Sequence, residues 1–465
     1  MRLLNLFIAA AVLSAGCMMG PNYKRPDSDL PQGADASNYS VFTQQNWWTM
    51  FDDEVLNKME DTALKYNWDL KAAVARVDQA RAAVTLAGAN QLPSVSAGGT
   101  SGREGNAQGS GESTSRAGLN VSFELDLWGK YRRMKESARA KLLATEAARD
   151  TVRLTLTADV AKQYFTMLML DNQIEIAQQT LAARKENVRI YQSRYDAGYA
   201  TEVDLRRVQA NMASVQAEEE NLRLQLAKTE TALAVLLGQS PRAMVEQRPA
   251  RGKTLNEVTL VPDVPADLPS DLLERRPDVM TAEQNLISAN ADIGVARASY
   301  FPDISLTAAA GYASSALTSL VSGGSGVWNF AGGITAPIFE GGKSKAQNKQ
   351  AEARYQEILA DYQKTVQLAF KEALDAINSN QLYRQMYDSY LSQTQDMRRS
   401  YELTKKQEDA GLIGVTDLLS VEETLLAAEM NLSTARNNEL DAVVDLAKAL
   451  GGGWTSQDIK EAEKK

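Results

Sequence analysis

The chain has 465 residues, a formal net charge of -9, no histidine and a single cysteine. The acidic balance argues against a nucleic-acid partner, and no basic stripe with interleaved aromatic residues is present. Without histidine, clustered metal sites and histidine-based acid–base catalysis are largely excluded. No nucleophile stands beside a base in any motif, so we expect no catalytic residue, no bound metal and no enzymatic activity.

The N-terminus resembles a bacterial export signal. Arg2 precedes an apolar run from Leu3 to Leu13, which is too short to span a bilayer. Small residues then lead to Cys17 in a pattern that resembles a lipobox, after which the cysteine becomes the lipidated first residue. An ordinary signal peptide with an incidental cysteine is the alternative. We expect export from the cytoplasm, an N-terminal lipid on Cys17 and no other cofactor.

The next segments predict a helix and then two pairs of strands. A helical pattern runs from Phe51 to about Gln91. Apolar residues then alternate with polar ones between Leu119 and Leu127, a period of two. A strand with one apolar and one polar face fits a barrel strand that faces lipid on one side and a wet lumen on the other. Pro302, like Pro93, stands between a helical pattern and a strand pattern. Residues 303–314 and 327–339 supply the second pair of strands.

Two very long helical patterns follow Gly129 and Gly342, and each covers about 65 residues, or roughly 100 Å. Their sustained three-four spacing indicates coiled-coil packing. Glycines at 198 and 411 end these runs, and shorter return helices follow at about 203–237 and 416–450. The long helices therefore form two hairpins.

The chain also repeats itself at a constant offset in numbering. Asp196-Ala197-Gly198 matches Asp409-Ala410-Gly411, and Asp204-Leu205 matches Asp417-Leu418 at the same offset. Such self-similarity predicts one structural unit used twice. The short helices at 201–237 and 271–300 together equal one long run, so we expect them to stack end to end.

Four strands per chain cannot close a transmembrane barrel, and open edges are not tolerated in lipid. Two chains would give eight strands, which side chains fill, whereas three chains give twelve strands and a lumen. The expected fold is mixed α and transmembrane β: a trimeric twelve-stranded β-barrel continued by a long periplasmic α-helical coiled-coil barrel. The expected segments are the signal peptide 1–16, a lipidated extended segment 17–50, a helix 51–92, strands 1–2 at 93–128, a helical hairpin 129–238, an equatorial insertion 239–270, a helix 271–301, strands 3–4 at 302–341, a second hairpin 342–450 and a tail 451–465.

Several stretches resemble a known family. "GPNYKRP", "FELDLWGKYRR" and "ERRPDVMTAEQNLISANADIGVARASYFPDISL" are similar to the outer membrane factor family of TolC-like efflux proteins, and most of all to the lipoprotein branch found in multidrug and copper/silver efflux. The resemblance implies a homotrimeric, lipid-anchored channel in the bacterial outer membrane with a large periplasmic extension. It also implies a passive conduit for small molecules, docked by a periplasmic adaptor and an inner-membrane pump. The alternatives are a type I protein-secretion channel and a non-conducting coiled-coil lipoprotein scaffold.

The resemblance also suggests a gate at the periplasmic end. Asp417 stands where the family often carries an acidic gate residue, and Ser420 takes the place of a second one. Glu422 and Glu423 would supply the missing charge one turn along. The alternative for Asp417 is helix capping, because its repeat partner Asp204 lies three residues after a threonine, the spacing of a capping box.

The turns between the hairpin helices resemble the adaptor-contact tips of the family. They are Ala197-Gly198-Tyr199 and Ala410-Gly411-Leu412. Each glycine is also expected to allow a left-handed turn between helices. The candidate tip residues are therefore Gly198, Tyr199, Gly411 and Leu412.

Overall fold

The structure is a computed structural model that describes residues 18–27, 42, 44–105, 111–259, 275–321 and 324–452. Several expected parts lie outside the described residues, so the expectations for them stay predictions. They are the signal peptide, Cys17, residues 28–41 and 43 of the extended segment, 260–270 of the insertion, 271–274 of the following helix and the tail from 453. The chain divides into two compact units. The first unit comprises 1–28, 75–147 and 280–365, and the second comprises 29–74, 148–279 and 366–465.

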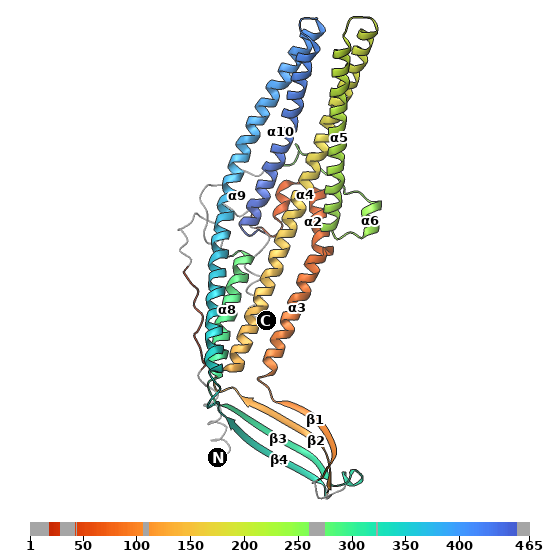
Figure 1. The fold of residues 1–465 in the computed structure, drawn as a ribbon. Coiled ribbons are helices and arrows are strands. Elements are labelled where there is room, and N and C mark those ends of the chain that lie inside the picture. The colour runs from red at the N-terminus through yellow and green to blue at the C-terminus, as the bar shows by residue number, and fades with distance from the viewer. Residues whose placement is uncertain are drawn as a thin grey trace. The chain divides into compact units, whose positions relative to one another are not determined.

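The first unit contains a four-stranded antiparallel sheet in the order β1-β2-β3-β4 (Figure 1). Its strands are β1 (Ser94–Gly105), β2 (Gly111–Leu125), β3 (Asp303–Ser314) and β4 (Gly326–Thr335). Gly118 and Gly311 face each other between β2 and β3, and a Cβ on Gly311 would lie 2.2 Å from the carbonyl oxygen of Ala117. Only glycine allows the two backbones to approach so closely. The expectation of four strands per chain is confirmed.

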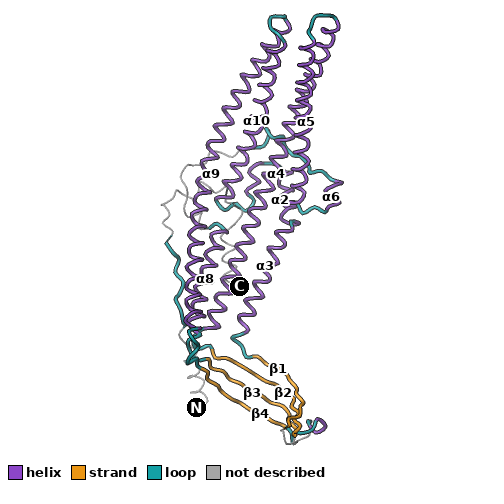
Figure 2. The backbone as a smooth tube through the Cα atoms, in the orientation of Figure 1, coloured by secondary structure: helices purple, strands orange, loops and turns teal. Residues whose placement is uncertain are grey.

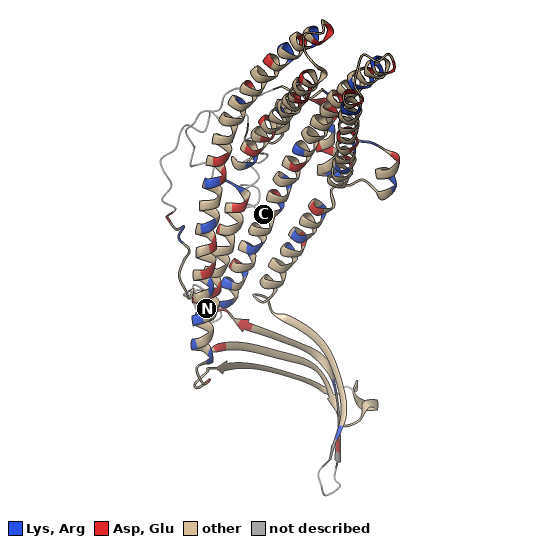
Figure 3. Ribbon diagram, turned by 45° about the horizontal axis from the view of Figure 1, so that its top comes forward, with Lys and Arg blue, Asp and Glu red and all other residues tan. Residues whose placement is uncertain are grey.

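Few charged side chains lie on these strands, whereas both signs are spread along the helices (Figure 3). Exposed apolar side chains on the strands include Val95, Leu119, Val327, Phe330 and Ile334. None of the described helices is both long and apolar enough to cross a membrane.

The repeat is visible in the bounds of the helices. The long helices α4 (Lys130–Asp196) and α9 (Lys343–Asp409) have 67 residues each, and the return helices α5 (Glu202–Leu236) and α10 (Val415–Ala449) have 35 each. Both pairs begin and end at the offset of the repeated sequence motifs, which confirms the two hairpins.

The short helices follow the same repeat with a slightly smaller offset. They are α3 (Trp68–Ala89) and α8 (Pro277–Ala298), with 22 residues each. The strands β1 and β3, which follow them, begin and end at this smaller offset too. The second repeat therefore contains four additional residues, and they fall between β3 and α9.

The helix expected from Phe51 to Gln91 is divided. A 3-10 turn, η2 (Trp47–Phe51), precedes α2 (Glu54–Tyr66), and α3 begins anew at Trp68. Asn67 causes the break, because its side-chain oxygen accepts hydrogen bonds from the backbone N–H groups of Asp69 (2.9 Å) and Leu70 (3.0 Å). It thereby acts as the N-cap of α3, a role that asparagine favours over a helix interior.

The short helices do stack end to end, but not in the combination that was expected. The Asn67 side-chain amide donates to the carbonyl of Leu236, the last residue of α5, so α5 ends where α3 begins. In the second repeat Arg276 donates to the carbonyl of Ala449, so α10 ends where α8 begins. The end-to-end pairing of 201–237 with 271–300 expected from the sequence is wrong, because each return helix meets the short helix of its own repeat.

The second unit is organised around an aromatic core beside α4. Phe51 and Phe165 pack edge to face with ring centroids 4.8 Å apart, and Tyr164 and Trp47 are fully buried beside them. Within the expected insertion, a short helix, α6 (Pro241–Glu246), precedes a segment that Asp53 holds by accepting the backbone N–H of Lys253 (3.1 Å). A 3-10 turn, η3 (Leu317–Ser319), lies between β3 and β4 of the first unit.

Candidate functional site

Both hairpin turns belong to the second unit, and they form the candidate site (Figure 1). The turns share one backbone geometry. Gly198 has φ 79° and Gly411 has φ 72°, values that favour glycine. The N–H of Tyr199 donates to the carbonyl of Arg194 (2.7 Å), and that of Leu412 donates to Gln407 (2.9 Å). These six-to-one bonds with a left-handed glycine form a Schellman motif, which ends each long helix.

The side chains that follow these glycines are strongly exposed. Tyr199 is 86% exposed and Leu412 is 75% exposed. A Cβ built on either glycine would meet nothing within 4 Å, so only the positive φ, and no close neighbour, requires glycine there. Each turn therefore presents one large, solvated side chain at its tip.

The first residues of the return helices differ between the two repeats. Thr201 caps α5 in a complete capping box: its hydroxyl accepts the N–H of Asp204 (3.2 Å), and the Asp204 carboxylate accepts both the N–H and the hydroxyl of Thr201. The capping role expected for Asp204 is confirmed. In the second repeat the cap position is Gly414, which has no side chain to complete a box.

Asp417 therefore keeps the carboxylate of the box without its partner. Its side chain is exposed and takes part in none of the hydrogen bonds or ion pairs found among the described residues. At about 100° per residue, Ser420 and Thr424 share the exposed face of Asp417, and Glu423 lies about 120° away around the helix. The exposed acidic face at the start of α10 is thus carried by Asp417.

Glu422 does not lie on that face. Its side chain is 7% exposed and lies 3.9 Å from the guanidinium of Arg184, which is 4% exposed. Asn187 donates to its other oxygen at 3.3 Å. Burial raises the pKa of Glu422, whereas Arg184 and the bond from Asn187 lower it. The expectation that Glu422 adds charge to an exposed ring is corrected: this carboxylate joins α10 to α4 inside the protomer.

Two further polar contacts join the hairpins. Glu408 of α9 accepts hydrogen bonds from Tyr191 and Arg194 of α4, both at 2.8 Å. The bond to Glu408 raises the pKa of Arg194, and burial raises that of Tyr191. In addition, Arg207 of α5 donates to the hydroxyl of Thr416 of α10 at 2.6 Å.

These contacts were not predicted from the sequence, because the residues that they join are far apart in the chain and helical periodicity does not identify such pairs. The sequence signal for them is a charged residue on the otherwise apolar face of a helix. An apolar cluster lies among them, formed by Tyr191, Leu205, Val208, Val415 and Leu419. Close to the turns the hairpins are therefore held together by buried apolar packing and by these polar contacts, and farther along Lys162 of α4 pairs with Asp445 of α10 at 2.6 Å.

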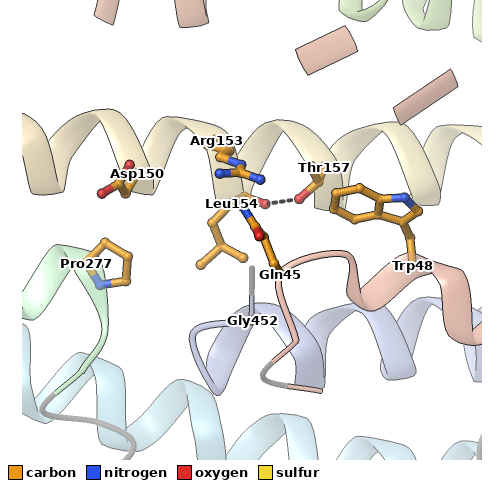
Figure 4. Close-up of a pocket in the computed structure, with 8 residues that line it drawn as sticks. All are labelled: Gln45, Trp48, Asp150, Arg153, Leu154, Thr157, Pro277 and Gly452. Atoms are coloured by element: carbon orange, nitrogen blue, oxygen red, sulfur yellow. Dashed lines mark hydrogen bonds between the residues drawn. The ribbon is translucent and has the colours of Figure 1, made fainter. Parts of the chain in front are cut away.

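One cavity among the described residues of this unit is small. A small cavity of about 10 Å³ is lined by Gln45, Trp48, Asp150, Arg153, Leu154, Thr157, Pro277 and Gly452 (Figure 4). This volume holds at most about one water molecule. Among the described residues no three His, Cys, Asp or Glu side chains gather to hold a metal ion.

Comparisons with known proteins agree with this architecture. The family model of the outer membrane efflux protein matches residues 60–239 and 268–452. The cation efflux system protein CusC of Escherichia coli O6:H1 is 32% identical over 97% of this chain and 99% of its own length. The solvent efflux pump outer membrane protein SrpC of Pseudomonas putida is 31% identical over 98% and 99%. The crystal structure of the Campylobacter jejuni CmeC outer membrane channel superposes with a TM-score of 0.89 and 28% identity, covering 96% of this chain and 98% of that one.

Proposed function

Because this chain belongs to the outer membrane efflux protein family, we propose that it is the outer-membrane channel of a tripartite efflux system, a passive conduit for small molecules. Its relatives include a cation efflux protein and a solvent efflux protein at nearly equal identity, so identity alone does not choose between these substrates. The proposal therefore names small toxic compounds or metal ions as the exported class.

The working unit is a homotrimer. In the first unit β1 and β4 are the edges of the sheet, and within the described chain neither has a second strand partner. Open edges are not tolerated in lipid, and twelve strands from three chains close a barrel with a lumen. The edge strands support closure by further copies of this chain.

A periplasmic adaptor docks at the hairpin tips and links the channel to an inner-membrane pump. The exposed Tyr199 and Leu412 support this role, because large side chains that a turn holds outward are suited to a partner surface. Their Schellman turns fix the position of each side chain without help from a neighbour. No cofactor is needed for passive export.

The periplasmic end is gated by a ring of Asp417 carboxylates, one from each protomer. The observation that carries this proposal is the incomplete capping box: Gly414 replaces the threonine, so the carboxylate stays free of a local partner. Three such carboxylates near one axis would attract cations. Glu422 supports the gate differently, by tying α10 to α4 through Arg184.

Cys17 is proposed to carry the N-terminal lipid. The support is the sequence Ser14-Ala15-Gly16 before it, which resembles a lipobox. Incorporation of radiolabelled palmitate into the natural chain, and its loss in Cys17→Ala, would test this assignment.

Single-channel conductance of the purified trimer in a planar bilayer tests the conduit and the gate together. We expect cation-preferring currents, and we expect Asp417→Asn to lower the cation preference several-fold. Gly414→Thr should lower it as well, because a threonine hydroxyl would draw the Asp417 carboxylate into a capping box. Asp204→Asn is the matched control and should leave the preference unchanged. An unaltered preference in both second-repeat variants would refute the gate, and assembled trimers without any conductance, even with an adaptor bound, would refute the conduit.

A further inference from the structure

Residues 18–25, here called the N-terminal strap, belong to the first unit and are drawn as a loop trace beside its helices (Figure 2). Their contacts place them along α8. Contacts run antiparallel to the helix, from Gly20 beside Gly294 to Arg25 beside Glu283. This stretch of helix spans about 17 Å, and the strap residues cover a similar length only when extended. The strap is thus an extended peptide bound in a groove between α8 and α4.

Arg133 of α4 forms the centre of this groove. The residue is 1% exposed. Its Nε donates to the carbonyl of Met19 (3.1 Å), and Nη2 donates to the side-chain oxygen of Asn22 (3.0 Å) and, at 3.4 Å, to the carbonyl of Gly20. Nη1 donates to Glu136 at 2.8 Å, which orients the guanidinium. A buried arginine that lost the strap would leave two donor groups unsatisfied, which is costly.

The groove also fits the strap sterically. Gly20 has φ 91°, and a Cβ there would lie 2.5 Å from the Cα of Gly294. A Cβ on Gly294 would in turn lie 2.7 Å from the carbonyl oxygen of Met19. Two glycines therefore face each other where strap and helix cross, an approach that no other residue type allows.

The far end of the strap is held by polar bonds. Asn290 donates to the carbonyl of Pro21 at 2.9 Å. Glu283 accepts from Tyr23 (3.1 Å) and from both the Nε and Nη2 of Arg25 (2.7 and 2.6 Å). Such a bidentate arginine–carboxylate pair is among the stronger polar contacts in proteins.

The near end of the strap meets the sheet. The N–H of Met19 donates to the carbonyl of Trp128, just after the end of β2 at Leu125. Cys17 stands two positions before Met19 in the sequence, a reach of about 7 Å at most. The docked strap therefore holds the chain next to Cys17 close to the end of β2.

We propose that the strap groove is a docking site that sets where the N-terminal lipid enters the membrane, with Arg133 as its positioning residue. This inference rests on the proposed lipidation of Cys17. Docking brings the lipid-bearing residue to the end of the strands that the barrel places in the outer membrane. An undocked strap would let the acyl chains sample the membrane away from the sheet of their own protomer.

The test attaches a nitroxide to Lys24→Cys in the purified full chain, because Lys24 is exposed and the lipid would block Cys17. We compare the natural background with Arg133→Met, with Gly20→Val, which alters the strap alone, and with the exposed control Lys135→Met. Docking predicts an immobile label in the natural chain and in the control, and a several-fold faster label in the other two. In these two variants, the fraction of outer-membrane protein that assembles as heat-labile trimer should also fall several-fold. Palmitate incorporation should stay unchanged. The melting temperature of Gly20→Val, followed by its helical signal, should also stay unchanged.

The proposal is overturned if the label stays immobile in Gly20→Val and Arg133→Met. It is also overturned if the strap is released and the trimer still assembles at the natural level. Gly20→Val keeps the test decisive should Arg133→Met fail to fold. Absence of palmitate from the natural chain would instead refute lipidation, while an immobile label there would still establish strap docking.

Discussion

The two hairpins have helices of equal length and differ at matched positions. Thr201 and Asp204 of the first repeat correspond to Gly414 and Asp417 of the second, at the offset that relates the two hairpins. In the first hairpin the carboxylate completes a capping box, and in the second it is exposed and has no hydrogen-bond partner in the described part of the chain. A single change at the cap position thus converts a structural carboxylate into one that is available for another role.

A second matched pair stands where the return helices end. Asn67 and Arg276 occupy equivalent positions, each directly before a short helix, and each donates to the last carbonyl of a return helix, that of Leu236 or Ala449. Asn67 caps α3 in addition, whereas Arg276 binds two carboxylates. The junctions are therefore equivalent in position but differ in the amount of buried charge, and variants at both can measure that difference.

The largest expected effect is at the second junction. Arg276 is 6% exposed and pairs with Asp278 (2.8 Å) and Glu372 (2.6 Å). Arg276→Ala should destabilise by about 2–3 kcal/mol, because it removes a buried guanidinium that donates to the partly buried Asp278 and to the carbonyl of Ala449. Asn67→Ala should cost about 1–2 kcal/mol, the value of a cap and a hydrogen bond. Chemical unfolding of both variants measures the difference, and equal losses would contradict the contrast between the junctions.

A smaller, pH-dependent effect is expected at Asp441, whose first-repeat counterpart is the exposed Lys228. Burial, and then Asp445, raises the pKa of Asp441 to about 7, while Lys162 and a hydrogen bond from Asn437 lower it. The folded chain binds this proton more tightly than the unfolded chain. Its stabilising contribution is therefore complete below about pH 4 and is lost as the pH rises through 7.

Asp441→Asn should accordingly raise the free energy of unfolding at about pH 8, on the order of 1–2 kcal/mol, and change little at about pH 4. The measurement is the melting temperature across this pH range. Lys228→Asn is the control and should show no such dependence. If Asp441→Asn raised the stability equally at both pH values, the raised pKa assigned to Asp441 would be contradicted.

Substitutions at the two cap positions are expected to change the stability in opposite directions. Thr201→Ala should destabilise by about 1 kcal/mol, because the N–H of Asp204 loses its acceptor. Gly414→Thr should stabilise by about 0.5–1 kcal/mol, because its hydroxyl would accept the N–H of Asp417 and complete the capping box. Hydrogen exchange of the amides in the first turns of α5 and α10 would report both changes, and weaker protection of α10 in Gly414→Thr would contradict the completed capping box.

The smallest stability change is expected for Asp417→Asn. Only the interaction of an exposed carboxylate with the N-terminus of α10 is removed, about 0.3–1 kcal/mol. Asp204→Asn should cost more, since it breaks the capping box. Unfolding of the two variants side by side would check this order, and a larger loss at Asp417 would indicate a structural partner for its carboxylate.

Much of the fold could be predicted from the sequence, because its signals are local. Glycines at 198 and 411 mark the turns, and heptad spacing marks helices whose ends agree closely with the structure. The break at Asn67 was missed, because the apolar period continues across it. Its signal was an asparagine two positions before an aspartate, a common start of a helix.

The candidate site was predictable only in part. The position of Asp417 follows from the repeat, and its exposure follows from the missing threonine at 414. The burial of Glu422 depends on Arg184, a residue of another helix far earlier in the chain, and helical periodicity does not reveal such partners. Polar links between elements remote in sequence are the part that required the structure.

The place where the second repeat carries its four additional residues has a consequence for engineering. Four residues added inside α9 would rotate every later side chain by about 40°, which would turn apolar faces away from their partners. Added between β3 and α9, they leave the register of both hairpins intact, as the 67- and 35-residue helices of each repeat demonstrate. The exposed turn at Leu317–Ser319 is therefore the place to splice in an affinity peptide, so that the chain can be captured from outside while its working parts keep their spacing.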